Sequence, residues 1–314
     1  MRTSVVTVLH NRPAAADLIM TPITSVFAPA KLNLFIHVTG RRPDGYHTIQ
    51  SAFQILDYCD ELQITPRDDS QLSLSCLRDC PLSLIDPATF ADLDSPNNLV
   101  LRAARALQEA SNTHNKGADI VLRKRIPVGG GLGGGSADAA ATLVALNHVW
   151  GLGLSCTELA TIGGRFGSDI PVLTLGHSAW AEGTGKDLAP LTLPRRVFLV
   201  IYPSVCSLTG PIFTHPDLVR STPPISRADY ESGSAKTWND LQPVAEALYP
   251  PIAAAVRWLS QFSPACMSGS GSCVFAAFDS TEDAGSVLRQ VPEPWGAFIA
   301  TGVNQWNHFK GNVG

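Results

Sequence analysis

The 314-residue sequence contains no run of about 18 apolar residues, which is the length that a membrane-spanning helix needs. It also has no His-Glu-x-x-His pattern or other histidine cluster, so the common zinc-hydrolase motif is absent. A basic surplus is missing too, because the net charge is −4 and the isoelectric point is about 6.0. A general nucleic-acid binder needs excess lysine and arginine against the phosphate backbone. We therefore expect neither a membrane protein nor a nucleic-acid-binding protein.

The seven cysteines are odd in number and scattered, which is not the pattern of a disulfide framework. We expect reduced, mostly buried thiols in a cytoplasmic protein. Cys76 and Cys80 form a close pair, but no second pair and no neighbouring histidine completes a zinc site. The apolar run near the start is broken between His10 and Pro13, and it is too short for a secretory signal. We expect residues 1–25 to form a disordered extension, with Met20 as an alternative start.

Length and a hydrophobic content of 45% allow a large core and two domains, and we place the boundary near 188–194. Hydrophobic periodicity and turn residues predict the elements. The expected strands cover 26–38, a segment ending at 55, 60–65, 71–76, 119–128, 177–181, 197–202, 273–278 and 297–301. The expected helices cover 99–110, capped by Asn97 or Asn98, then 136–150, 155–165, 235–262 with a break at 250–251, and 280–290. Residues 81–96 are expected to form a loop, and the second half reads as a compact α+β domain.

The first predicted strand alternates apolar residues with a second set that includes Lys31, Asn33 and His37. This pattern predicts a half-buried strand with Lys31 and Asn33 on its polar face. Those two side chains are candidates for chemistry, although a solvated sheet face explains them equally well. The turn Arg41-Arg-Pro-Asp-Gly-Tyr-His follows, and Tyr46 with His47 fits either base stacking or a simple aromatic anchor.

Residues 127–146 read PVGGGLGGGSADAAATLVAL, with glycine at six of the seven positions from 129 to 135. A glycine loop lets the backbone approach a ligand closely, and a helix that starts near Ser136 aims its free N–H groups at the same place. This combination is typical of phosphate binding. A flexible linker is the alternative, but linkers are seldom followed at once by a strong helix former.

Two other phosphate-binding loops fit less well. A Walker loop needs a lysine after the glycines, and none is present. The dinucleotide pattern G-x-G-x-x-G is formally present at Gly129, Gly131 and Gly134, but it should follow a buried parallel strand. The preceding segment instead carries Arg123–Arg125 and then Pro127, so it reads as an amphipathic, half-exposed strand.

Two further loops are candidates with ordinary alternatives. Asp169 lies in a Gly-Ser-Asp-Ile-Pro turn, where it fits either a catalytic carboxylate or simple turn chemistry, and Pro171 is expected to keep Ile170 out of a helix. The run Ser268-Gly-Ser-Gly-Ser fits either a second phosphate nest or the entry to a strand.

Taken together, three segments resemble a known superfamily: APAKLNLFIHVTGRRPDGYH, PVGGGLGGGSADAA and MSGSGSCVFAAF. Their order and spacing over about residues 26–305 are similar to the small-molecule kinases that include galactokinase, homoserine kinase, mevalonate kinase and phosphomevalonate kinase. Within this superfamily, GRRPDGYH resembles the same segment in the kinase branch of the non-mevalonate isoprenoid route, whose acceptor carries a cytidine diphosphate. The usual loop is nearer to GLGSSA, and the one-glycine-longer GLGGGSADA is a feature of that branch. Residues 1–25 have no counterpart.

The resemblance implies an α+β fold with two domains and the active site in the cleft between them. Residues 26–190 would be an N-terminal ATP-binding kinase domain, with a mixed sheet and helices, and residues 191–314 a smaller ferredoxin-like domain on the substrate side. The implied reaction transfers the γ-phosphoryl group of ATP, with Mg²⁺ and no tightly bound prosthetic group, to the C2 hydroxyl of a cytidine diphosphate-linked methylerythritol. A monomer or homodimer in the cytoplasm is expected.

The resemblance also assigns roles to residues. Asp169 matches the base that accepts the hydroxyl proton, and Lys31 matches the partner that keeps this carboxylate ionised. Ser136 is a candidate magnesium ligand. The ATP-binding positions are Pro127, Gly129, Gly130, Gly131, Leu132, Gly133, Gly134, Gly135 and Ser136, and the substrate-binding positions are Asn33, Tyr46, His47, Thr209, Phe213, Gly269, Ser270 and Gly271. An aromatic ring would stack on the pyrimidine, and an imidazole or main-chain group would read its amino edge.

Two alternatives remain. A homoserine-type or mevalonate-type kinase would not need Tyr46, His47 and Phe213 as a pyrimidine clamp. A non-catalytic nucleotide-binding relative would lack Lys31 or Asp169, and both are present.

Overall fold

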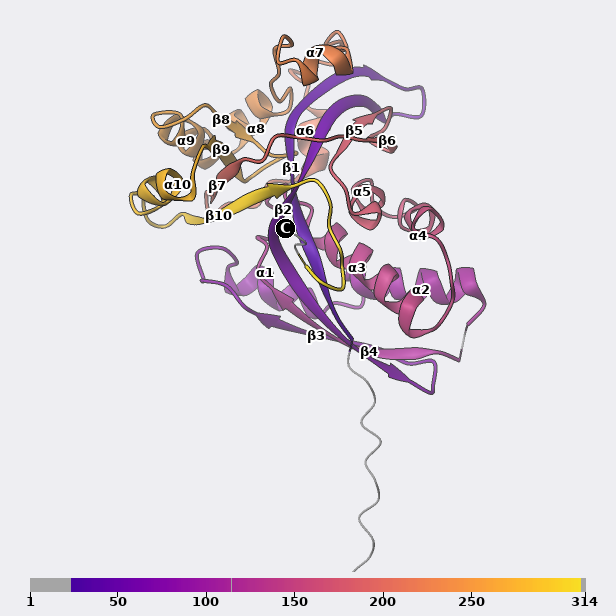
Figure 1. The fold of residues 1–314 in the computed structure, drawn as a ribbon. Helices are drawn as coiled ribbons and strands as arrows, with labels where there is room; N and C mark the ends of the chain where they lie inside the picture. Colours follow the sequence, from indigo (N-terminus) through magenta and orange to yellow (C-terminus); the bar gives the residue numbers. More distant parts are fainter. Residues whose placement is uncertain (1–23, 114, 312–314) are drawn as a thin grey trace, which may run out of the picture.

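The structure is a computed structural model that describes residues 24–113 and 115–311. The expected extension therefore lies outside the described residues, as does Met20, except that Thr24 and Ser25 begin the first strand. The fold is α+β, and ten strands are linked by pairing into one connected sheet (Figure 1). None of the helices in the described ranges has both the length and the apolar character that crossing a bilayer requires.

Two long antiparallel strands, β1 (Thr24–Arg41) and β2 (His47–Arg67), run through the whole height of the molecule (Figure 1). The prediction of two separate strands within β2 was wrong. Cys59 and Asp60 stay paired with β1, so the ladder carries the chain through the expected gap. The prediction of a half-buried β1 was also wrong, because Lys31 and Asn33 are only 3% exposed. Chain from both halves of the sequence packs around β1 and covers both of its faces.

The second edge of β2 pairs in succession with three other strands. Antiparallel β4 (Gly117–Lys124) lies along residues 61–67, β10 (Gly296–Val303) touches residues 55–56, and β5 (Ala179–Glu182) pairs with residues 51–53. Outside these, β3 (Leu72–Arg78) runs parallel to β4, and β6 (Asp187–Pro190) pairs with β5. Strand β2 is thus the common support of both halves of the molecule.

The helices of the first half pack on one another and on the sheet around a core rich in alanine and leucine. They are α2 (Leu99–Ser111), α3 (Gly134–Val149), α4 (Cys156–Gly163) and α5 (Ile170–Leu175). Asn98 caps α2, and the Ser155–Glu158 capping box of α4 is confirmed.

Two local predictions in this half were wrong. Helix α5 begins at Ile170, because Pro171 lies in the first turn, where a missing N–H costs no hydrogen bond. The expected loop 81–96 contains α1 (Pro87–Ala91), whose start is capped by the carboxylate of Asp86, and a 3₁₀ turn, η1 (Asp92–Asp94).

The second half has the order β7 (Val197–Tyr202), α8 (Gln242–Leu248), α9 (Pro250–Leu259), β8 (Ala265–Met267), β9 (Val274–Phe278), α10 (Thr281–Leu288) and β10. Its sheet order, β10-β7-β9-β8, confirms the predicted ferredoxin-like arrangement. Short helices α6 (Thr209–Thr214) and α7 (Arg227–Glu231) lie in the preceding segment. The predicted helix from 235 begins only at Gln242, because residues 238–240 are hydrogen-bonded to β1.

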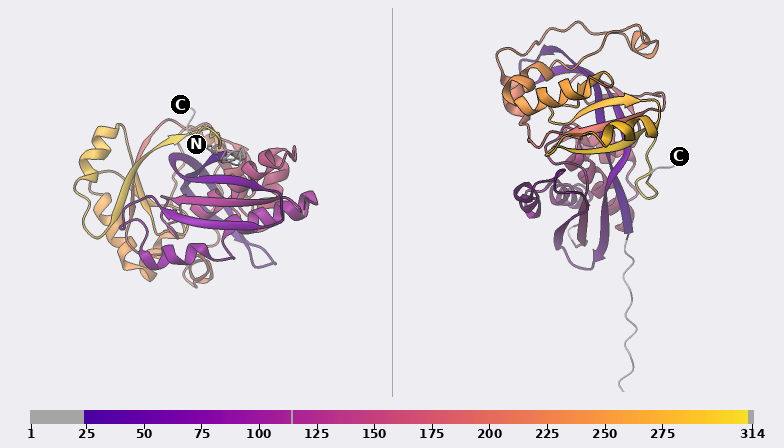
Figure 2. Two further views of the ribbon diagram at one scale, coloured as in Figure 1. Left: turned by 90° about the horizontal axis from the view of Figure 1, so that it is seen from below. Right: turned by 90° about the vertical axis from the view of Figure 1, so that its left-hand side faces the viewer.

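The ferredoxin-like sheet has two packed faces. One carries α8, α9 and α10 (Figure 2), and the other contributes Phe198, Val200 and Phe298 to a core shared with Ala30 and Leu32 of β1. After β10 the chain returns to the first half, where the Phe27 N–H donates to the carbonyl of His308 at 2.7 Å. The domain boundary near 190 falls between β6 and β7 and stays a prediction.

A buried ion cluster lies beneath the glycine loop and was not predicted. The ammonium of Lys124, on β4, contacts Asp60 of β2 and lies 2.8 Å from a carboxylate oxygen of Asp138 on α3. The other oxygen of Asp60 accepts the backbone N–H groups of Arg125 and Ile126, at 2.5 Å and 2.9 Å. The cluster therefore joins two strands to the helix that follows the glycine loop.

We expect Lys124→Met to lower the free energy of unfolding by about 3 to 5 kcal/mol, because it leaves two buried carboxylates without their cation. Asp138→Asn keeps an acceptor for Lys124 and should change the free energy of unfolding by less than about 1 kcal/mol. Denaturant unfolding of the two variants checks this. Equal destabilisation by both substitutions would contradict the assigned roles.

Candidate active site

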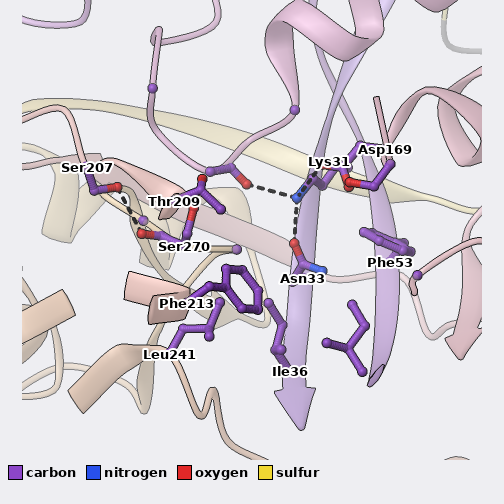
Figure 3. Close-up of a pocket in the computed structure, with 18 of the residues that line it drawn as sticks. Lys31, Asn33, Ile36, Phe53, Asp169, Ser207, Thr209, Phe213, Leu241 and Ser270 are labelled. Atoms are coloured by element: carbon purple, nitrogen blue, oxygen red, sulfur yellow. Dashed lines mark hydrogen bonds and ion pairs between the residues drawn. The ribbon is translucent and has the colours of Figure 1, made fainter. Parts of the chain in front are cut away.

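The ammonium of Lys31 is the centre of the site (Figure 3). It lies 3.2 Å from Oδ2 of Asp169, and it donates to Oδ1 of Asn33 at 2.5 Å and to the carbonyl of Gly131 at 3.1 Å. The ring of Phe53 lies beside it, with 5.4 Å between the ammonium and the ring centroid. A buried ammonium needs such partners, since an unpaired one costs several kcal/mol. The predicted pair of Lys31 and Asp169 is thus brought together.

Asp169 immediately precedes α5, and its carboxylate makes no capping hydrogen bond to that helix. Its side chain is 27% exposed, whereas that of Lys31 is 3% exposed. One carboxylate oxygen therefore pairs with the buried ammonium while the group still faces the cavity lined by residues of both halves. This is the placement that an acceptor of a substrate proton needs.

The amide of Asn33 is held from both ends. Its oxygen accepts from Lys31, and its nitrogen donates to the hydroxyl of Ser51 at 2.9 Å. That hydroxyl donates in turn to the carbonyl of Phe35 at 2.6 Å. Asn33 was predicted to bind substrate, and it lines the cavity, but its protein partners already fix the direction of the Lys31 ammonium.

The glycine loop approaches its neighbours too closely for side chains. Gly129, Gly131 and Gly133 have φ between +67° and +73°, a region that favours glycine. A Cβ on Gly131 would stand 2.1 Å from the carbonyl of Ser268, and one on Gly129 would stand 2.0 Å from the sulfur of Cys206. Helix α3 begins at Gly134 without a side-chain cap, so its first N–H groups remain free for a ligand.

A cavity of about 640 Å³ lies on the outer side of this loop. Every residue predicted to bind ATP lines it, from Pro127 to Ser136. Its further lining was not predicted and includes Asn97, Asn98 and Leu99 at the start of α2, together with Lys124 and Asp138. The sequence signal at Asn97 and Asn98 was a helix cap, which gave no indication of a second role.

A second cavity adjoins the first and shares Gly129, Gly131, Gly133 and Thr209 with it. Lys31 and Asp169 line this cavity, together with Phe213 and residues 269–271. Thr209 and Ser270 are hydrogen-bonded at 2.8 Å, which joins α6 to the loop after β8 (Figure 3). Ile36, Phe53 and Leu241 complete its apolar wall and were not predicted, because apolar residues in strands and helices are usually read as core.

Two predicted substrate residues stand outside this lining. Tyr46 is 68% exposed at the turn between β1 and β2. His47 lies beside Phe213, with 5.1 Å between the ring centroids and 38° between the ring planes. The predicted clamp therefore has the rings of His47 and Phe213 in contact, while Tyr46 is not among the described residues that line the cavity.

Asn239 is a further positioning residue that sequence reasoning missed. Its side-chain nitrogen donates to the carbonyls of Met267 and Gly269, at 2.7 Å and 2.8 Å. The carboxylate of the following residue, Asp240, accepts the N–H of Val38 on β1 at 2.6 Å. Residues 238–240 thus connect β1 to the loop that closes the cavity. An Asn-Asp pair in a loop carries no periodic signal that would have identified it.

The described residues offer few ligands for a magnesium ion. Within 24–311, position 114 aside, no group of three or more His, Cys, Asp or Glu side chains is placed to hold a metal. Magnesium in kinases needs only one or two protein ligands, because substrate phosphates and water complete its shell. Ser136 lies near the turn before Asp169, since a Cβ on Gly167 would be 3.7 Å from the Ser136 hydroxyl oxygen. A serine hydroxyl at the start of α3, in the cavity behind the glycine loop, is an oxygen ligand that fits the metal.

We expect Asn239→Ala to lower kcat by about 10- to 100-fold, because the loop at 267–269 loses two hydrogen bonds and shifts relative to Lys31. Asn304→Ala is the control, since the Asn304 side chain makes two backbone hydrogen bonds, both to Leu193, away from the cavities, whereas Asn239 makes three. Steady-state kinetics on both variants check this. Equal loss of activity in the control would mean that the effect is general.

Models of the GHMP kinases match the chain in two places. The model described as the GHMP kinases N terminal domain covers residues 98–177, and the model described as GHMP kinases C terminal covers residues 222–297. The first match contains the glycine loop and Asp169, and the second contains residues 268–271.

Relatives and solved structures extend the match to most of the chain. The sequence is 48% identical to 4-diphosphocytidyl-2-C-methyl-D-erythritol kinase of Chromohalobacter salexigens, over 89% of this chain and 91% of the relative. The enzyme of that name from Nitrosococcus oceani is 45% identical, over 88% of this chain and 94% of the relative. A crystal structure of 4-(cytidine 5'-diphospho)-2C-methyl-D-erythritol kinase aligns with a TM-score of 0.71 at 29% identity, covering 89% of this chain and all of that one. Homoserine kinase from Cytophaga hutchinsonii, at 16% identity and a TM-score of 0.63, covering 93% of this chain and 98% of that one, shares the fold alone.

Proposed function

The chain belongs to the 4-diphosphocytidyl-2-C-methyl-D-erythritol kinases within the GHMP kinases, and from this premise we propose how its residues perform the reaction. The protein phosphorylates the C2 hydroxyl of 4-diphosphocytidyl-2-C-methyl-D-erythritol, with ATP as the donor, in isoprenoid synthesis. One observation carries the proposal for the residues. The ion pair of buried Lys31 with partly exposed Asp169 stands where the cavity behind the glycine loop adjoins the cavity lined by Phe213.

Asp169 acts on the acceptor hydroxyl. Its exposed oxygen accepts the hydroxyl hydrogen bond and takes the proton as the new O–P bond forms and the bond from the γ-phosphorus to the departing ADP oxygen breaks. Lys31 holds the other oxygen at 3.2 Å, which fixes the position of the carboxylate. A tertiary alcohol is a weak acid, so alignment of the hydroxyl with the donor phosphate contributes more than proton removal alone.

The glycine loop binds the phosphates of ATP. Residues 129–135, six of which are glycines, line the outer cavity together with the uncapped first turn of α3, and their backbone N–H groups would donate to the phosphates. The carbonyl of Gly131 turns instead toward Lys31 and the hydroxyl of Ser268, at 3.1 Å and 3.0 Å. The loop therefore offers donors to the nucleotide and an acceptor to the catalytic lysine.

Ser136 is the residue that we propose to hold Mg²⁺. When bound, the metal neutralises charge on the transferring phosphoryl group. The hydroxyl of Ser136 lies at the start of α3, where phosphate oxygens would complete the shell. Isothermal titration of the protein with MgATP, compared with metal-free ATP, measures this contribution in wild type and in Ser136→Ala.

Phe213 stacks on the cytosine ring, and Thr209 with residues 269–271 binds the diphosphate and the sugar alcohol. These residues line one cavity with Lys31 and Asp169, which supports a common acceptor site. A homoserine-type or mevalonate-type activity is the second candidate. If homoserine or mevalonate turned over faster than the cytidine substrate, or if excess CDP failed to compete with the acceptor, the specificity proposal would be wrong.

We expect Asp169→Asn to lower kcat by at least about 100-fold while binding of ATP and acceptor is preserved, because the amide keeps the shape but cannot take a proton. The assay follows ADP release from MgATP and the cytidine-linked methylerythritol, and equilibrium titration gives the two affinities. An unchanged kcat would remove Asp169 from the role of base.

A further inference from the structure

Arg220 connects both rings of the proposed pyrimidine site and has no role in the reaction described above. Its Nε donates to Nε2 of His47 at 3.1 Å. Its two terminal nitrogens donate to three carbonyls at the end of α6 and just after it: those of Phe213 at 3.0 Å, His215 at 2.7 Å and Leu218 at 2.9 Å. One guanidinium thus holds the backbone that carries Phe213 and the imidazole that lies against it.

The contact with Arg220 determines where the proton of His47 resides. A guanidinium can only donate hydrogen bonds and stays charged in proteins. The imidazole nitrogen that faces it must therefore accept, so Nε2 carries no proton. A neutral imidazole then carries its proton on Nδ1, for which the described part of the chain provides no hydrogen-bond partner. His47 presents a donor.

The charges around His47 favour the same state. Partial burial lowers the pKa of His47 below its usual value near 6.5, and the positive charges of Arg220 and Arg41 lower it further. Arg220 approaches from the segment after α6, and Arg41 faces His47 across the β1–β2 ladder. At neutral pH the ring is accordingly uncharged, and acidification has to overcome both arginines before Nε2 can take a proton.

A donor at Nδ1 distinguishes the two common pyrimidines where it meets N3, because O2 accepts hydrogen bonds in both. The N3 and O2 atoms of cytosine accept hydrogen bonds, whereas its exocyclic amino group donates. Uracil carries a proton on N3. An N–H donor opposite that atom therefore faces a second donor, and no hydrogen bond forms. The expectation that an imidazole reads the amino edge therefore changes, and the acceptor edge becomes the one that His47 can bind.

We propose that Arg220 is a positioning residue that fixes His47 as a neutral Nδ1–H donor and thereby makes the acceptor site select cytosine over uracil. This inference rests on the proposed function, because it concerns the same acceptor site. It adds a residue and a rule of specificity that catalysis by Lys31 and Asp169 does not require.

The test uses CDP and UDP as competitive inhibitors against the cytidine-linked acceptor. Wild type should bind CDP at least about tenfold more tightly than UDP, as expected for a misplaced donor in a partly buried contact. In Arg220→Met both tautomers of His47 become available, so the binding of CDP should weaken. The UDP-to-CDP ratio of inhibition constants should then fall to about 1 to 3, and the KM for ATP should change by less than about twofold. Arg220→Lys keeps a charged donor and should retain most of the ratio.

The pH dependence separates this role from simple support of the loop. In Arg220→Met, acidification through about pH 6.5 protonates His47 and restores a donor at Nδ1, so discrimination against UDP should return. In wild type the donor is present throughout, so the ratio should stay flat over the same range. A merely structural arginine would leave the ratio independent of pH in the variant as well.

Arg41→Met is the matched control, because it removes a nearby positive charge but no hydrogen bond to His47. It should retain the wild-type ratio at neutral pH. An unchanged UDP-to-CDP ratio in Arg220→Met would overturn the inference, as would an equal loss of ATP and CDP affinity in that variant. If wild type itself did not phosphorylate the cytidine-linked acceptor, the proposed function would fail, and that result is separate from the ratios.

Discussion

The burial of one ammonium group, that of Lys31, is the constraint on which the arrangement of the site depends. A lysine that is 3% exposed must find oxygen partners, because a buried cation without them is strongly destabilising. The three oxygens come from the same strand, from the glycine loop and from the turn before α5. Satisfying this charge therefore brings the phosphate-binding loop and the catalytic carboxylate to fixed positions on either side of one nitrogen atom.

The free edge of β1 extends this constraint along the strand. Backbone groups on that edge bond to the glycine loop at Lys31, to the hydroxyl of Ser268 at Asn33, and to residues 238–240 at Ile36. One strand thus carries the nucleotide loop, the loop after β8 and the segment before α8. Since β2 on its other side is paired with strands of both halves, relative movement of the halves would break hydrogen bonds on both edges of the pair. The cavities are therefore held by backbone bonds rather than by side-chain packing alone.

Whether the sequence predicted a feature of the fold or the site depends on how far apart in the sequence the interacting residues lie. The glycine loop, the capping box at Ser155 and the pairing of Lys31 with Asp169 were accessible, because local chemistry or a resemblance in motifs marks them. The burial of both faces of β1 could not be predicted, because the alternation of residue types within one strand does not show which other segments pack against it. Asn33 bonds to Ser268 at a separation of 235 residues, and no single-sequence pattern carries such a contact. Asn239, Arg220 and the Lys124 cluster were missed for the same reason: their partners are backbone atoms or charges of distant segments.

The two buried lysines near the glycine loop differ in the number of carboxylates that they contact. Lys31 faces one carboxylate, whereas Lys124 lies between two, and a Cβ on Gly134 would stand 2.9 Å from its ammonium. With both carboxylates ionised, the Lys124 cluster would carry a negative charge directly beneath a loop that binds phosphates. Burial raises the pKa of Asp138 well above its usual value in spite of Lys124, and the neighbouring Asp60 raises it further. This upward shift favours the neutral form of Asp138, which reduces the negative charge beneath the free N–H groups at the start of α3.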